Sequence, residues 1–186
     1  MKIIKIFIFL LISLNVPLKA YSNENIQNIL NDGGKIIFIR HAYAPGGGDP
    51  INFDISDCST QRNLNEEGIV QSINIGNFFL KNDIKIDKIL SSEWCRCKET
   101  AKYAFKKFET KNFLNSFFSQ KFANNKNQQI KELKEYVQNW DSKKNLVLVT
   151  HYVIILEVTN STVSSGEMVV TDKNFNVLAQ QEISVN

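Results

Sequence analysis

Both histidines of the chain follow apolar segments, a position typical of catalytic groups at the end of a buried strand. Ile36–Ile39 is followed by Arg40 and His41, and Leu146–Thr150 is followed by His151. An imidazole can attack phosphorus, and a guanidinium matches phosphate oxygens in a forked geometry. A neighbouring cation disfavours protonation of an imidazole, so the pairing makes sense where an anion binds. We therefore expect His41 to be a nucleophile and Arg40 a phosphate clamp.

The alternative for each histidine alone is a hydrogen-bonded structural residue at a strand end. A third segment favours the functional interpretation, because the apolar run Ile84–Leu90 leads to Ser91, Ser92 and then Arg96. In parallel sheets, ligands bind at the carboxyl ends of the strands. We expect both histidines, Arg40 and Arg96 to converge there.

Apolar segments that alternate with helical patterns predict an α/β fold, a three-layer sandwich with a mostly parallel central sheet flanked by helices. Polar residues with Pro and Gly make 44–62 a long loop. The segment 113–122 is aromatic and ambiguous. The other predicted elements are helices near 24–31, 66–79, 93–108, 129–140 and 153–158, strands at 35–39, 84–90 and 146–150, and a closing hairpin over 168–178.

The N-terminus has the layout of a secretory signal peptide. It begins with lysines, continues with the apolar run Ile6–Leu14 and ends with a small-residue site at Ala20–Ser22. The alternative is an uncleaved anchor or a buried first helix. We expect a signal peptide over 1–22, one domain over 23–186 and, in a Gram-negative-type cell, a periplasmic protein that does not span the membrane once the signal is removed.

The charge of the chain argues against a nucleic-acid partner. The 22 basic residues exceed the 19 acidic ones by three, and this excess equals the three lysines of the signal, Lys2, Lys5 and Lys19. The mature domain is formally neutral, whereas a nucleic-acid surface needs a basic excess.

Three cysteines allow at most one disulfide within the chain. Cys58, Cys95 and Cys97 have no histidine at zinc-ligand spacing, so we expect no metal site. In an oxidising compartment a bridge between Cys58 and Cys95 would tie the long loop to the wall of the site. Free buried thiols are the alternative.

Four motifs, in chain order, resemble the histidine phosphatase superfamily, the group of phosphoglycerate mutases and acid phosphatase-like enzymes, and here a small exported branch of it. Arg40 and His41 match the first two residues of its Arg-His-Gly, and Leu64 and Gly68 match the two ends of its Leu-Thr-x-x-Gly, with Asn65 in place of Thr. The stretch "SSEWCRCKETA" at 91–101 matches Ser-x-x-x-x-Arg-x-x-x-Thr-Ala, and "VLVTH" at 147–151 matches a strand that ends in Thr-His.

The resemblance implies that His41 becomes phosphohistidine and that Arg40, Arg96 and His151 complete the phosphate pocket. No metal or organic cofactor is implied, because cationic side chains neutralise the phosphoryl group. Arg62 is expected to be a further anion contact, and its alternative is a solvated loop arginine.

The chain departs from the family pattern at two points. Ala42 replaces the usual Gly. The family's proton donor is also missing, because Tyr152 stands where acid phosphatase-like members have Asp. Glu93 is our first candidate donor, with Asp49 and Asp57 as substitutes. The alternative for Glu93 is an acid that stabilises a helix N-terminus.

Together these features predict an exported, metal-independent phosphatase that hydrolyses a phosphomonoester or a phosphorylated cell-envelope component through phosphohistidine. The domain is too short for a large lid that excludes water, which favours hydrolysis over transfer. The alternatives are a catalytically inactive anion-binding or scaffold protein on the same fold, and a mutase or phosphohistidine-protein phosphatase.

Overall fold

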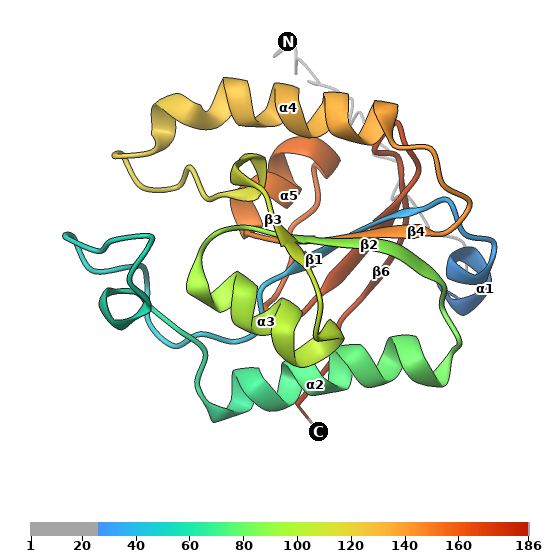
Figure 1. Ribbon diagram of the computed structural model, residues 1–186, viewed down its shortest axis with the longest axis horizontal. Helices are drawn as coiled ribbons and strands as arrows, with labels where there is room; N and C mark the ends of the chain where they lie inside the picture. The colour runs from blue at the N-terminus through green and yellow to red at the C-terminus, as the bar shows by residue number, and fades with distance from the viewer. Residues whose placement is uncertain (1–25, 186) are drawn as a thin grey trace, which may run out of the picture.

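A six-stranded sheet forms the middle layer of the computed structural model, which describes residues 26–185 (Figure 1). The predicted signal peptide therefore lies outside the described residues. The strands follow the order β3-β2-β4-β1-β5-β6. They are β1 (Ile36–Arg40), β2 (Ile86–Ser91), β3 (Glu109–Thr110), β4 (Asn145–Thr150), β5 (Met168–Thr171) and β6 (Val177–Gln181).

Four neighbouring strands pair in parallel, and the last two pairings of the sheet are antiparallel. β3, β2, β4 and β1 pair in parallel, whereas β5 pairs antiparallel with β1 and forms a hairpin with β6. The predicted mostly parallel sheet and the closing hairpin are both present. Because the parallel strands run the same way, the carboxyl ends of β1, β2 and β4 meet at one edge.

Helices cover both faces of the sheet, as predicted for a three-layer α/β sandwich. α2 (Glu66–Lys81) and α3 (Cys95–Phe105) cover one face, and α4 (Lys126–Asn139) and α5 (Tyr152–Thr159) cover the other (Figure 1). The short helix α1 (Ile26–Asn31) leads into β1.

Alternate side chains of the central strands fill two separate cores. Ile37 and Ile39 of β1 belong to the core beneath α2 and α3, whereas Ile36 and Phe38 belong to the core beneath α4 and α5. All six residues of β4 are buried. The continuous apolar run of β4 therefore forms a strand that is buried on both faces, as is usual for a parallel strand between two helical layers.

A glycine sets the close approach of α2 to α3. A Cβ atom added at Gly76 would lie 2.2 Å from the backbone oxygen of Ala104. No side chain fits at that distance, so the two helices can pack at this separation only around glycine. α3 in turn presents Arg96 to the sheet edge.

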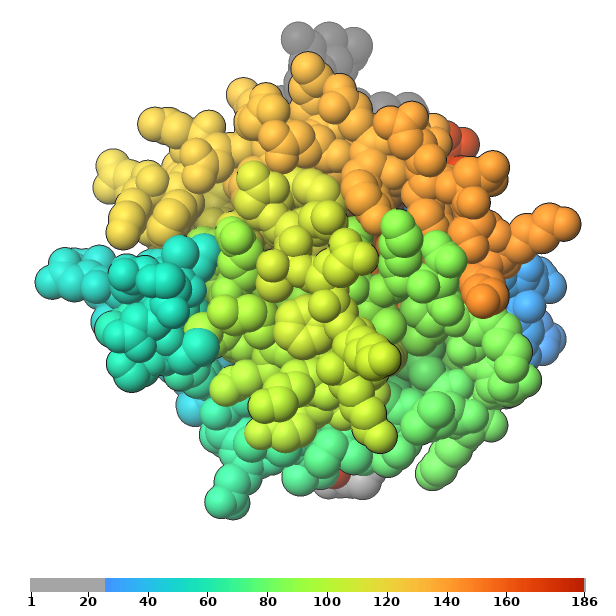
Figure 2. Space-filling model, viewed as in Figure 1, coloured from blue at the N-terminus to red at the C-terminus, as the bar shows by residue number. Residues whose placement is uncertain are grey.

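Two irregular segments flank the edge where the parallel strands end. One is the loop between β1 and α2, which contains the 3-10 turn η1 (Cys58–Thr60). The other joins β3 to α4 through the 3-10 turns η2 (Asn112–Leu114) and η3 (Ala123–Asn125). In Figure 2 the cyan loop and the yellow segment lie next to each other at one side of the molecule.

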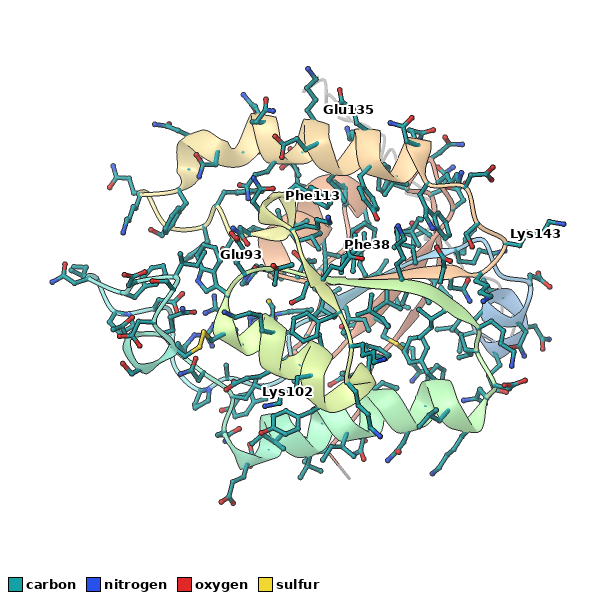
Figure 3. The ribbon with its side chains drawn as sticks, in the orientation of Figure 1. Phe38, Glu93, Lys102, Phe113, Glu135 and Lys143 are labelled. Carbon is teal, nitrogen blue, oxygen red and sulfur yellow. A yellow bond between two sulfur atoms is a disulfide. The ribbon has the colours of Figure 1, made fainter. Side chains whose placement is uncertain are left out.

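The ambiguous aromatic stretch 113–122 thus forms a short 3-10 turn and irregular chain. Phe113 is buried in the same core as Phe38 (Figure 3), whereas Phe118 is exposed. Within residues 26–185, no helix combines the length and the apolar character that a membrane span requires.

Candidate active site

The ends of three parallel strands bring the predicted residues to one cavity. Strand register places Arg40, the last residue of β1, beside Thr150, the last residue of β4. The backbone N–H of His41 then donates to the carbonyl of Thr150 at 2.9 Å. As a result the two imidazole rings lie 5.5 Å apart, centre to centre.

His41 is held as a neutral imidazole with one nitrogen free. Its Nδ1 lies 2.8 Å from the carbonyl oxygen of Ala42, and because a carbonyl only accepts, Nδ1 must hold the proton. Burial, and after it the charge of Arg96, lowers the pKa of His41 well below its usual value. Nε2 therefore keeps a lone pair, which is what a nucleophile needs.

A hydrogen-bond chain fixes the orientation of His151. Ser92 Oγ donates to Asn115 Oδ1 at 3.0 Å, so it can accept from Nε2 of His151, which lies 2.9 Å away. With the proton on Nε2, Nδ1 of His151 accepts from Nη2 of Arg96 at 3.4 Å. Burial is again the main reason that the pKa of His151 is well below its usual value.

The chain has only three arginines, Arg40, Arg62 and Arg96, and all three line the same cavity. In each of them Nη1 is bound by the protein. Nη1 of Arg40 donates to the carbonyl of Val163 at 2.8 Å, that of Arg62 to the carbonyl of Ala44, and that of Arg96 to Asp49.

The Nε atom of each of these arginines is buried and has no hydrogen-bond partner. Nε–H and Nη2–H lie on one edge of a guanidinium and can bind two oxygens of one anion. A buried donor without a partner is costly, and a ligand is one explanation for it. The Nε–H groups of all three arginines are thus left for an oxyanion, whereas Nη2 of Arg96 already contacts His151.

Asp49, in the glycine-rich part of the loop, is the carboxylate at the centre of these contacts. Its Oδ1 accepts from Nη1 of Arg96 at 2.8 Å and from the backbone N–H of Arg62 at 3.0 Å. Its Oδ2 accepts from Nε1 of Trp94 and again from Nη1 of Arg96, both at 3.1 Å. The Asp49 and Arg96 side chains are only 11% and 5% exposed, so this ion pair is buried.

The cavity has a volume of about 600 Å³ and is lined by a charged cluster and by a largely apolar wall. Its charged residues, within the described part of the chain, are the three arginines and Asp49. They leave two positive charges, which is the charge that a phosphomonoester dianion would neutralise. The apolar wall contains Pro50, Ile51, Phe53, Trp94, Phe118 and Val153, with Ser116, Ser119, Gln120 and Tyr152 among them. Trp94 and Phe53 are buried, whereas Ile51 and Phe118 are exposed.

Glu93, our first candidate proton donor, does not line the cavity. It lies two residues before α3, beside the irregular segment that follows β3 (Figure 3), and its Oε2 accepts from Nδ2 of Asn115 at 2.6 Å. Asp57, one of the two substitutes, caps the 3-10 turn η1 and also lies outside the lining. Of the carboxylates considered, Asp49 alone is in the cavity.

Cys58 and Cys95 form a disulfide that joins the loop to the first residue of α3, drawn as a yellow bond in Figure 3. Cys95 directly precedes Arg96, and Cys58 lies four residues before Arg62, so the bond restrains the loop segment that contains Arg62. Cys97 is a free, buried thiol, and burial raises its pKa to about 12. In residues 26–185 no three His, Cys, Asp or Glu side chains gather as a metal site would require.

Sequence reasoning did not single out Asp49 as the partner of Arg96. Two signals were present in the sequence. Asp49 follows three consecutive glycines, and arginine is rare in a chain that otherwise uses lysine. Each of the three arginines lies in or next to one of the motifs. This restriction would have indicated that Arg62 is a site residue as strongly as it indicated Arg40 and Arg96.

Solved structures with this arrangement of strands and helices include phosphatases and a mutase. The protein histidine phosphatase SixA complexed with tungstate matches with a TM-score of 0.56 and 14% identity, over 81% of this chain and 97% of the other. Phosphoglycerate mutase from Thermus thermophilus gives 0.55 and 14%, over 78% and 97%. A candidate alpha-ribazole-5′-P phosphatase from Escherichia coli gives 0.57 and 13%, over 82% and 96%.

This chain has the histidine phosphatase fold. The fold expected from the four motifs is thereby confirmed, and it extends over nearly the full length of each of these structures. No family model and no curated protein matches the sequence. On this fold, Arg40, His41, Arg96 and His151 all line the cavity at the carboxyl edge of the sheet.

Proposed function

We propose that this protein is a phosphatase that hydrolyses a phosphomonoester in two steps through a phosphohistidine at His41. The observation that supports it best is a neutral imidazole with a free Nε2 in a cavity lined by three guanidinium groups. A further support is the tungstate in the SixA structure, because tungstate is an oxyanion and that protein has the same fold.

In the first step Nε2 of His41 attacks phosphorus. A bond forms between nitrogen and phosphorus, the bond from phosphorus to the leaving oxygen breaks, and its electron pair stays on that oxygen. In the second step water attacks phosphorus, the phosphorus–nitrogen bond breaks, and phosphate and the free imidazole result. Arg40, Arg62 and Arg96 would stabilise the charge on the phosphoryl oxygens in both transition states. His151, whose Nδ1 accepts from Nη2 of Arg96, would hold that guanidinium in place. The site needs no metal ion for this chemistry.

We also propose that the protein acts outside the cytoplasm, on a phosphorylated small molecule or envelope component. The support is the basic and apolar sequence of residues 1–22. Mass determination of the protein from its native host should give a chain that begins near residue 23. A chain that begins at Met1 would contradict export by a cleaved signal.

Turnover of 4-nitrophenyl phosphate by the wild type and by His41→Asn tests the mechanism. We expect the variant to lose about 1,000-fold or more in kcat, because the nucleophile is removed. A rapid quench of the wild type should trap an acid-labile phosphoryl group on His41. Equal activity of the two proteins would exclude the mechanism. Phosphate binding by the wild type without any turnover would instead support the anion-binding scaffold.

A further inference from the structure

The outer part of the cavity presents apolar side chains directly beside the phosphate end. The ring of Trp94 lies 5.3 Å from that of His151, and the ring of Phe53 lies 5.7 Å from that of Trp94, centre to centre. Phe118 and Ile51, which line the same cavity, are 75% and 93% exposed. A group bonded to the phosphorus would meet this apolar wall on leaving the charged end.

The described cavity residues include no carboxylic acid that could protonate the leaving oxygen. Asp49 is the one carboxylate in the lining, and all of its contacts are with N–H donors, two of them on the Arg96 guanidinium. It therefore acts as an acceptor and an ion-pair partner. The Glu93 carboxylate is bound by Asn115, away from the cavity.

A leaving group that departs without a proton must be a weak base. A phenol such as the tyrosine side chain has a pKa of about 10. Water has a value of about 15.7, and aliphatic alcohols are acids of comparable weakness. Phenoxide is therefore a far better leaving group than an alkoxide when no acid assists, and an aromatic ring also fits the apolar wall.

From these two observations we infer that the substrate is an aryl phosphate, a phosphoryl group bonded to a phenol oxygen. The inference rests on the proposed function and specifies its substrate. Nε2 of His41 forms the bond to phosphorus, the bond to the phenol oxygen breaks, and phenoxide leaves with the electron pair and takes its proton from solvent. The ring is not expected to bear a second phosphate. The only cationic residues of the described lining are the three arginines, and all three are assigned to the phosphate that is transferred.

The dependence of kcat/KM on the acidity of the leaving phenol tests whether any acid of the protein protonates the leaving oxygen. In a series of substituted phenyl phosphates, we expect kcat/KM to rise several-fold for each unit by which the phenol pKa falls. A flat dependence would mean that an acid, such as the Tyr152 hydroxyl, protonates the leaving oxygen, and it would overturn the inference.

The apolar wall is tested with Phe118→Ser against Leu80→Ser. The two side chains are 75% and 78% exposed, but Leu80 lies near the end of α2, outside the cavity. We expect Phe118→Ser to lower kcat/KM for phenyl phosphate about tenfold, because ring burial is lost, and to change that for methyl phosphate by less than about twofold. Leu80→Ser should change neither. Equal losses with both substrates, or no loss, would contradict the inferred wall.

Binding of phosphonates separates failure of the inference from failure of the proposed function. Phenylphosphonate should bind the wild type about tenfold more tightly than methylphosphonate, whether or not any ester is hydrolysed. Turnover of methyl phosphate at the rate of phenyl phosphate would overturn the substrate class while the phosphatase function stands.

A comparison of a tyrosine-phosphate peptide with free phenyl phosphate distinguishes the two sources of an aryl phosphate. A higher kcat/KM for the peptide indicates a protein substrate, and a higher kcat/KM for phenyl phosphate indicates a small molecule.

Discussion

The Asp49 carboxylate accepts two hydrogen bonds from Nη1 of Arg96, at 2.8 and 3.1 Å, and the pair is almost fully buried. This contact spans 47 residues of sequence and fixes one end of the guanidinium. The buried Nε of Arg96 is left without a partner, and Nη2 lies toward His151. Asp49 is therefore a positioning residue, and it also cancels one of the three positive charges in the cavity.

Asp49→Asn should separate these two effects. The neutral amide adds one net positive charge to the cavity, so the inhibition constant of inorganic phosphate should fall about fivefold at low salt. Arg96 loses its fixed orientation, so kcat should also fall, by about tenfold. Steady-state kinetics with phosphate as inhibitor measures both values. Asp83→Asn, at an exposed carboxylate, is the control, and identical behaviour of the two variants would show that Asp49 has no such role.

The histidines should make stability depend on pH below 6.5. Both folded pKa values are well below 6.5, mainly because of burial, whereas in the unfolded chain each imidazole binds a proton near 6.5. The unfolded state thus binds more protons in this range, and the free energy of unfolding should fall as pH falls, by up to about 1.4 kcal/mol per pH unit for each imidazole.

Denaturant unfolding between pH 5 and 7.5 measures this dependence. The double variant His41→Gln/His151→Gln should show a clearly weaker one, since glutamine does not titrate. An equally steep loss of stability in the double variant would assign the effect to other groups.

Reduction of the Cys58–Cys95 disulfide should destabilise the protein. The bond closes a loop with a sequence separation of 37, for which the chain-entropy model gives about 4 kcal/mol. We expect the urea midpoint to fall when a reductant is added, and kcat/KM to fall with it, because Arg62 and Asp49 belong to the tethered loop. Cys58→Ala/Cys95→Ala should resemble the reduced protein and be insensitive to the reductant. A reductant effect that persists in this variant would refute the assignment.

Gly76→Ala should destabilise the fold by about 2 kcal/mol or more, because the added methyl meets the backbone of α3 rather than a movable side chain. Gly47→Ala is the matched control, since a Cβ atom at Gly47 has no neighbour within 4 Å. Chemical denaturation of both variants measures the difference. A similar free energy of unfolding for the two would mean that the helices move apart without cost.

Apolar patterning was sufficient to predict the layers and the strand ends. The runs at 36–39 and 146–150 are long enough for strands and are followed by polar residues. Because the carboxyl ends of parallel strands meet at one edge of the sheet, these polar residues could be placed together. Helix α2 was predicted over 66–79, and the Asn65 side chain caps it by accepting from the backbone N–H of Gly68.

The loop contacts could not be predicted in the same way. The sequence pattern around Asp49 has no period, and its partners Trp94 and Arg96 lie more than 40 residues away. Whether Asp49 or Asp57 enters the cavity depends on the path of the loop, and this path depends on glycine conformations and on the disulfide. The pattern of residues 113–122 likewise does not distinguish buried Phe113 from exposed Phe118.

The covalent link between Cys58 and Cys95 also bears on when the protein becomes active. A chain still in a reducing cytoplasm keeps its thiols apart, and the loop with Asp49 and Arg62 is then untethered. Completion of the cavity would follow only once thiols are oxidised. If the chain is secreted as proposed, the enzyme would stay inactive during synthesis because this bond has not yet formed, and it would not hydrolyse phosphorylated metabolites inside the cell.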